Sequence, residues 1–178
     1  MSTLTTPKNK TDLKLQDSLA GVINAVKDNP DNAEAAFSVT SRLEKGFHST
    51  INTRDFEFIS DEPESLGGKN EGPNPIEYVL GALAACQEIV IKAHATQLGI
   101  EVKSVKVDAT GDLDLHGFFN LSKARPGFTN VRYQTVIETE ETDPVKLQKL
   151  KDISLKNCPV LDVIQNPVPV TGEVTYIN

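Results

Sequence analysis

The sequence is poor in cysteine, in long apolar runs and in clustered positive charge. Its 178 residues include only two cysteines, Cys86 and Cys158, which are too few for the disulfide framework of a small secreted domain. No apolar run approaches the roughly 18 to 20 residues that a bilayer-spanning helix needs, and no basic start leads into an apolar signal segment. These absences predict a cytoplasmic protein with no membrane partner, in which the two thiols are free, catalytic or redox-sensing.

The lack of clustered basic residues argues against a nucleic-acid-binding protein. The formal net charge is -7, and Lys and Arg are dispersed, whereas nucleic-acid binding requires clustered positive charge to release counterions. Glycine-rich phosphate loops and the GxSxG element are absent. The three histidines, His48, His94 and His116, lack metal-ligand spacing. We therefore expect no nucleic-acid partner, no metal site and no cofactor.

The chain is long enough for one main domain, with an extension in front of it. Residues 1–35 are expected to form a polar arm of eleven residues followed by an amphipathic helix over residues 12–27, with Asp12 available as its cap. The apolar stripe of this helix contains Leu15, Leu19, Val22, Ile23 and Val26. Residues 36–178 are expected to form the main domain. Its first part, residues 36–60, has the β-branched and aromatic composition of two or three short antiparallel strands.

A central helix is indicated by strong start and stop signals. Asn74 suits the N-cap, Pro75 the first helical position, and Glu77 falls where its carboxylate reaches back to the cap. The helix is expected to run to about Gln97, with Gly99 as its stop. Its apolar residues cover much of its circumference, so it is predicted to be mostly buried.

After the central helix, the expected strands and helices do not alternate strictly along the chain. Two strands are expected over residues 101–115 and 130–140, joined by an apolar loop. A helix is expected to open at Thr142, Asp143 and Pro144, and a short helix is expected to follow Cys158 and Pro159. A closing strand is expected over residues 167–178. The resulting order, βββ-α-ββ-αα-β, predicts an α+β fold with antiparallel or mixed sheets packed on helices.

Each cysteine has a structural and a chemical interpretation. Cys86 shares a helical face with Val79, Leu83 and Val90, so it is either a small core residue or a shielded reactive thiol. Cys158 precedes the proline that begins the short helix, where unpaired N–H groups and the helix dipole are expected to favour the thiolate. A cap position is more often filled by serine or aspartate, which favours a chemical role for this thiol.

The charged candidates are also open to two interpretations. Glu77 is either a capping-box carboxylate or a catalytic one. Arg42, Lys45 and Arg54 lie in the strand region, where each is either a solvated surface residue or the cation that activates Cys86.

Four stretches together resemble a known family. The segment "LGGKNEGPNPIEYVLGALAAC", followed by "DATGDLDLHGFF", "RPGF" and "NCPVLDVIQNPVPV", is similar to the OsmC/Ohr superfamily of osmotically inducible and organic hydroperoxide resistance proteins. The similarity covers roughly residues 36 to 178, and the "GPNP" loop before a cysteine-bearing helix is its most specific part. Within the superfamily the chain resembles the general OsmC-like branch more than the defined hydroperoxide reductases.

The resemblance implies an OsmC-like fold and an intertwined homodimer with two sites at the subunit interface. It also implies that Cys86 attacks an organic hydroperoxide and that Cys158 resolves the product as a disulfide, which a dithiol reductant then reduces. In the hydroperoxide reductases a glutamate directly follows the "NP" pair, whereas here Ile76 takes that place and Glu77 follows it. The expected function is therefore a thiol-dependent peroxidase, and the alternative is a non-catalytic dimer that binds a hydrophobic small molecule at its interface.

Overall fold

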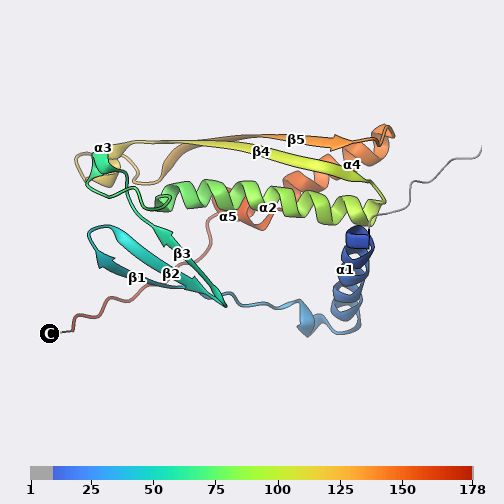
Figure 1. The fold of residues 1–178 in the computed structure, drawn as a ribbon, viewed down its shortest axis with the longest axis horizontal. Helices are drawn as coiled ribbons and strands as arrows, with labels where there is room; N and C mark the ends of the chain where they lie inside the picture. Colours follow the sequence, from blue (N-terminus) through green and yellow to red (C-terminus); the bar gives the residue numbers. More distant parts are fainter. Residues whose placement is uncertain (1–9, 178) are drawn as a thin grey trace, which may run out of the picture.

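The computed structural model describes residues 10–177 of the chain. Two antiparallel sheets and a set of helices make up the fold (Figure 1). The elements, in chain order, are α1 (Lys10–Asp28), η1 (Pro30–Ala33), β1 (Thr40–Lys45), β2 (His48–Thr53), β3 (Phe56–Ser60), η2 (Glu64–Leu66), α2 (Pro75–Leu98), β4 (Val102–Leu113), α3 (Leu115–Phe118), β5 (Phe128–Thr139), α4 (Pro144–Lys156) and α5 (Pro159–Gln165). This architecture confirms the predicted α+β class with antiparallel sheets.

The long hairpin of β4 and β5 is the framework on which the helices pack. Its register places Val107 opposite Thr135 and Ala109 opposite Tyr133. Residues of β5 alternate between half-buried and exposed positions, so one face of the hairpin meets the helices and the other meets solvent. In Figure 1, α2 lies along the hairpin, with α4 and α5 beside it on the same side.

Helix α2 begins and ends where its sequence signals predict. The backbone N–H of Glu77 donates to Oδ1 of Asn74 at 2.9 Å, and the N–H of Asn74 donates to Oε2 of Glu77 at 2.8 Å. These two bonds form a complete capping box, which satisfies amide groups that have no partner inside the helix. At the other end Gly99 adopts a φ of 68°, a left-handed conformation that favours glycine. The chain thereby leaves α2 and turns directly into β4.

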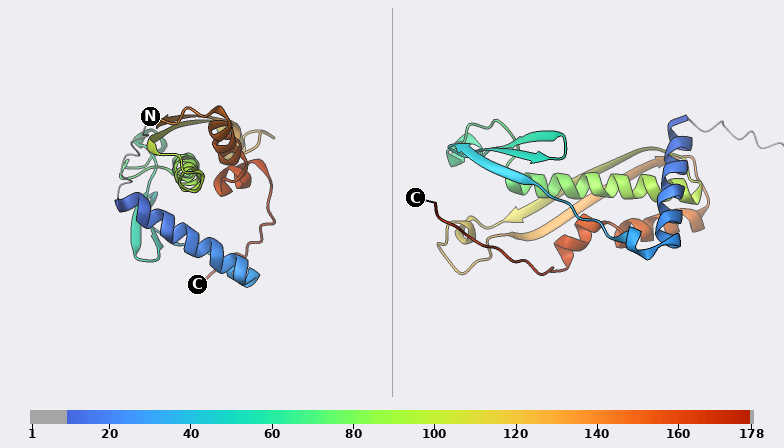
Figure 2. Two further views of the ribbon diagram at one scale, coloured as in Figure 1. Left: turned by 90° about the vertical axis from the view of Figure 1, so that its right-hand side faces the viewer. Right: turned by 90° about the horizontal axis from the view of Figure 1, so that it is seen from below.

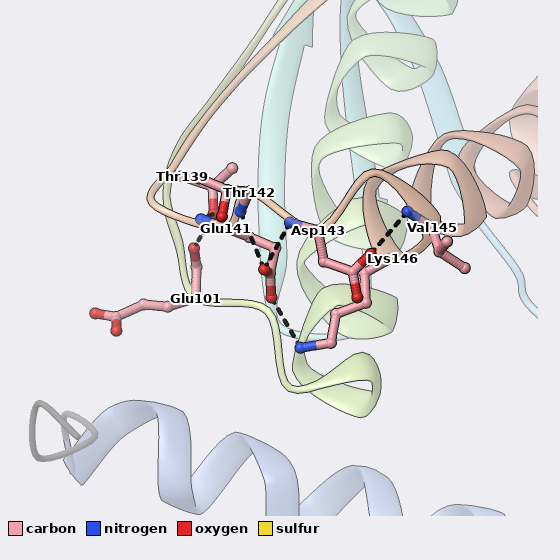
Figure 3. A network of polar contacts seen from close by, with 7 residues as sticks. All are labelled: Glu101, Thr139, Glu141, Thr142, Asp143, Val145 and Lys146. Atoms are coloured by element: carbon pink, nitrogen blue, oxygen red, sulfur yellow. Dashed lines mark hydrogen bonds and ion pairs between the residues drawn. The ribbon is translucent and has the colours of Figure 1, made fainter. Parts of the chain in front are cut away.

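A polar network fixes the connection from β5 to α4 (Figure 3). The hydroxyl of Thr139 donates to the carbonyl of Glu101 at 2.6 Å, which ties the end of β5 to the segment before β4. The carboxylate of Glu141 accepts the backbone N–H groups of Thr142 and Asp143 and pairs with Lys146 at 2.8 Å. Its pKa is lowered, first by the hydrogen bond from Lys146. Asp143 accepts the N–H of Val145 and caps α4, which begins within the predicted start at Thr142, Asp143 and Pro144.

The three-stranded sheet β1-β2-β3 precedes a tight loop that leads to α2. The carboxylate of Asp61, only 2% exposed, accepts the backbone N–H groups of Glu62, Lys69 and Glu71. Gly68 is required in this loop, because a Cβ there would lie 1.8 Å from the carbonyl oxygen of Glu62. The loop is therefore folded around one buried carboxylate.

The extension is helical, with a different start from the one predicted. The predicted arm of eleven residues is too long, since α1 already includes residues 10 and 11; residues 1–9 lie outside the described part. Asp12 is therefore not the cap. It lies inside the first turn and forms an ion pair of 2.8 Å with Lys92 of α2. Figure 2 shows α1 crossing the end of α2 and extending away from the β4–β5 hairpin.

The apolar stripe of α1 is only partly covered. Leu15, Leu19, Ile23 and Val26 are half-buried, as the periodicity predicts, but Val22 is 64% exposed. Helix α1 contacts α2, which it crosses, and the η1 turn that follows it in the chain.

The predicted closing strand is wrong for the described chain. Residues 166–177 form no helix or strand, and Val170 and Tyr176 are almost wholly exposed. A strand needs a neighbouring strand edge to accept and donate its backbone hydrogen bonds, and the segment runs away from α5 without reaching one (Figure 2). The alternating valines of this segment are typical of a β-strand, but local alternation does not determine whether a neighbouring strand is present to pair with it.

Among residues 10–177, none of the helices has the length and apolar character needed to cross a membrane.

Candidate active site

The two cysteines meet in one apolar cluster, here called the thiol cluster. Its buried members are Leu83 of α2, Cys158 and Leu161 of α5. Cys86, Val90, Val131, Tyr133, Val160 and Ile164 pack against them. A second cluster, here called the distal cluster, contains the buried residues Ile91, Ala95, Ile100, Val102 and Leu150. Residues 86 and 158 are far apart in the sequence, and the packing of α5 on α2 brings them together.

Cys158 is the N-cap of α5, as its position before Pro159 predicts. Its Sγ accepts the backbone N–H of Leu161 at 3.5 Å, and the side chain is 1% exposed. Burial raises the pKa of the Cys158 thiol and outweighs the opposing effect of the Leu161 N–H; the neighbouring Cys86 raises the pKa further. The expectation that the helix start favours a thiolate here is therefore wrong, because an apolar environment disfavours the charged form more than one turn of helix favours it.

Cys86 is half-buried on α2 and faces the same cluster. Both thiols are free. Because a cysteine thiolate is the attacking species in thiol chemistry, the pair combines one thiol that is partly accessible with a second that is enclosed and kept neutral.

Tyr133 is a member of this site that the sequence did not single out. It lies on the helix-facing side of β5, and its pKa is raised by burial and by the nearby Cys158. The alternation of apolar and polar residues along β5 was a signal for its burial, but nothing local indicated which helix it would meet.

Glu77 lies away from the thiols of its own chain. It lies nine positions before Cys86 on α2, which corresponds to about 13.5 Å along the helix and about half a turn around it. Its carboxylate is occupied by the capping box, and it lines an open hollow of about 610 Å³ together with Asn70, Glu71, Gly72, Pro73, Leu80 and Ala109. The described protomer therefore does not bring Glu77 to the cysteine pair.

The three basic candidates lie on the other sheet. Arg42 and Lys45 belong to β1, whose residues are all exposed. The guanidinium of Arg54 sits 5.0 Å from the ring centroid of Phe56, in the geometry of a cation–π contact. Sheet β1-β2-β3 meets α2 near its first turns, where the Tyr78 hydroxyl donates to the carbonyl of Ile59. Within one protomer the structure thus pairs Cys86 with no cation from this set.

Across residues 10–177, no three His, Cys, Asp or Glu side chains are grouped as metal ligands. The side chains around the two thiols are apolar apart from the phenol of Tyr133.

Comparison with solved structures places this fold among known ones. It is similar to an OsmC-like protein from Mycoplasma pneumoniae, with a TM-score of 0.64 and 18% identity over 75% of this chain and 90% of that one. It is also similar to an organic hydroperoxide resistance protein OsmC from Legionella pneumophila (TM-score 0.55, 20% identity, 75% of this chain and 93% of that one). A third similar structure is an organic hydroperoxide resistance protein from Elizabethkingia anophelis (TM-score 0.56, 17% identity, 75% and 91%).

Two comparisons of sequence were also made with known proteins. No curated protein matches the chain. The family model described as OsmC-like protein matches residues 68–173, more than half of the chain, and this range contains α2 and both cysteines. The chain belongs to the OsmC-like protein family.

Proposed function

We propose that the protein is a thiol-dependent peroxidase that reduces organic hydroperoxides with Cys86 and Cys158. The observation that carries the proposal is the packing of both free cysteines in one apolar cluster, although they come from different helices. Two of the similar structures are named organic hydroperoxide resistance proteins, which agrees with a role in peroxide defence.

The environment of each thiol supports a division of roles. Cys158 has a raised pKa and is 1% exposed, so it stays protonated near neutral pH and is a poor first nucleophile. Cys86 is half-buried and therefore more accessible. Apolar neighbours such as Leu83 and Val90 favour a hydroperoxide with a hydrocarbon tail over hydrogen peroxide.

In the proposed reaction the Cys86 thiolate attacks the outer peroxide oxygen. An S–O bond forms as the O–O bond breaks, and the leaving alkoxide takes up a proton to become an alcohol. Cys158 then loses its proton as its sulfur attacks the sulfenic sulfur of Cys86; the S–S bond forms, the S–O bond breaks, and the hydroxyl leaves with that proton as water. A dithiol of the reducing cytoplasm would return both cysteines to thiols and be oxidised to a disulfide itself.

We also propose that the active form is a homodimer. One face of α2 is apolar, small and uncovered in the protomer: Gly81, Ala82 and Ala85 are exposed, and Ile89 is 69% exposed. An uncovered apolar helix face of this kind is typical of a protein interface. In such a dimer Arg42, Lys45 or Arg54 of the second protomer would be the candidates for a cation beside Cys86, because none of the three lies in the thiol cluster of its own protomer.

The alternative is a dimer that binds a hydrophobic small molecule without reacting with it. The observation in its favour is that Arg42, Lys45 and Arg54 lie on β1 or in the β2–β3 turn, away from the thiol cluster of the protomer. In that case the thiols would have no activating charge, and the apolar surroundings alone would bind the ligand.

Single-turnover oxidation distinguishes the two functions. One equivalent of cumene hydroperoxide per chain is expected to remove both free thiols, and peptide mapping should then show a disulfide between the peptides that contain Cys86 and Cys158. If both thiols remain free after a cumene hydroperoxide treatment that oxidises a control dithiol, the peroxidase proposal is wrong and the binding function is favoured.

A further inference from the structure

Among residues 10–177, two buried side chains each contain a polar atom that has no hydrogen-bond partner. Gln87 of α2 is 1% exposed, and its amide nitrogen Nε2 has no acceptor. The hydroxyl oxygen of Thr135 on β5 is buried and has no partner either. Because an unpaired buried donor retains its full desolvation cost, such groups in a native protein usually bind an internal water molecule.

The two residues occupy the same level of the fold. On α2, Leu83 belongs to the thiol cluster and Ile91 to the distal cluster, and Gln87 lies one turn from each. On β5, Tyr133 packs against the thiol cluster and Ile137 against the distal cluster, with Thr135 between them on the same face. Since α2 and β5 run in the same direction (Figure 1), Gln87 and Thr135 both lie at the level between the buried residues of the two clusters, Leu83 on one side and Ile91 on the other.

Helix α4 contributes a third polar residue at this level. Ser154 follows Leu150 of the distal cluster by one turn and precedes Cys158 of the thiol cluster by four residues. It is 8% exposed, and its hydroxyl proton goes to the carbonyl of Lys151 at 2.8 Å. The lone pairs of Ser154 Oγ remain available to accept a hydrogen bond.

We propose that Gln87, Thr135 and Ser154 bind one internal water molecule in the polar layer between the thiol cluster and the distal cluster. The amide of Gln87 donates to the water oxygen, the water donates to Ser154, and the Thr135 hydroxyl completes about three hydrogen bonds, the usual number for a buried water. Since Gln87 directly follows Cys86, this water links the turn of α2 that carries Cys86 to β5 and α4. The site does not depend on the proposed peroxidase activity.

Water–protein NOE spectroscopy on the full chain tests the site with water itself as the probe. The side-chain amide protons of Gln87 are expected to show cross-peaks to a long-lived water. The exposed amide of Gln134 on β5 serves as the control and should show only rapidly exchanging hydration. If the Gln87 amide shows no long-lived water, the proposal is wrong, and this measurement needs no variant to fold.

A second measurement counts the water directly. In oxygen-17 relaxation dispersion, the double variant Gln87→Met with Thr135→Val should contain one long-lived water fewer than the unmodified protein. The control variant Gln134→Met should contain the same number as the unmodified protein. An unchanged count in a folded double variant would overturn the proposal.

Discussion

The backbone N–H of Leu161 donates to the sulfur of Cys158, so this thiol is held by the helix that it caps. The bond alone would stabilise a thiolate, yet burial has the larger effect and the pKa of Cys158 lies above its ordinary value. Its thiol is thus held in place in the neutral form. That combination suits a group that reacts second, after a neighbouring sulfur has become electrophilic.

The roles of the two cysteines can be separated by matched serine variants. Cys86→Ser should abolish the first turnover with cumene hydroperoxide, since a hydroxyl is a far weaker nucleophile than a thiolate. Cys158→Ser should keep the first turnover and lose recycling, and the sulfenic acid on Cys86 should become trappable by dimedone. Stopped-flow consumption of hydroperoxide and mass spectrometry of the adduct measure both effects. The opposite pattern, with Cys158→Ser inactive and Cys86→Ser active in the first turnover, would reverse the assignment.

Substitution of Glu77 tests whether it is a helix cap or a catalytic group. Glu77→Ala removes the reciprocal bond to the Asn74 N–H and is expected to lower the free energy of unfolding by about 1 kcal/mol. Glu77→Gln should retain most of this stability, because glutamine also serves in a capping box. If Glu77 is only a cap, both variants should keep the unmodified first-turnover rate. Urea unfolding and stopped-flow oxidation give the two readouts; a slow but stable Glu77→Gln would indicate a catalytic carboxylate.

The central helix could be predicted from sequence because its signals are local. Asn74, Pro75 and Glu77 fix its start and Gly99 fixes its end, and each acts on residues within one turn. The half-turn between Glu77 and Cys86 was also calculable from their spacing. Gln87 shows a missed local signal: it lies midway between Leu83 and Ile91 on the buried stripe of α2, where a polar side chain marks an internal hydrogen-bonding site.

Features that depend on distant parts of the chain could not be predicted in the same way. The contact between Cys86 and Cys158 arises from the packing of α5 on α2, which no local pattern specifies. Residues 167–177 show the converse case, because their alternation predicts a strand although no strand edge lies beside them in the described chain. The resemblance to a family supplied the cysteine pairing, and the residues alone left it open.

Asp61 is expected to make the free energy of unfolding depend on pH in the acid range. Burial would raise the pKa of this carboxyl, but the N–H donors of Glu62, Lys69 and Glu71, with His48 nearby, outweigh it and leave the pKa lowered. Because the pKa of Asp61 is lower in the folded protein than in the unfolded chain, its ionised carboxylate stabilises the fold at pH values above the unfolded pKa of about 3.9. This stabilisation is lost as the pH falls below that value towards the lower pKa of the folded protein.

Asp61→Asn should therefore lower the melting temperature at pH 7, and should make the melting temperature less dependent on pH below about pH 4. Thermal unfolding followed by circular dichroism across this range measures both effects. Other carboxyls with lowered pKa values, such as Asp112 and Glu141, should leave a residual dependence in the variant. If Asp61→Asn has the same melting curve as the unmodified protein at pH 7, the loop does not depend on this carboxylate.

The proposed dimer can be tested on the uncovered face of α2, where Ile89 is 69% exposed beside Ala82 and Ala85. Ile89→Lys would place an unpaired charge in an interface formed by this face, which is strongly unfavourable. The matched control is Val136→Lys, because Val136 is 53% exposed on β5 and lies opposite Lys106 on the solvent face of the hairpin. Light scattering at micromolar concentration should give twice the chain mass for the unmodified protein and for Val136→Lys, and a shift toward the monomer for Ile89→Lys. A monomeric unmodified protein would remove the interface from the proposed function, and an unaffected Ile89→Lys dimer would place that interface on another surface.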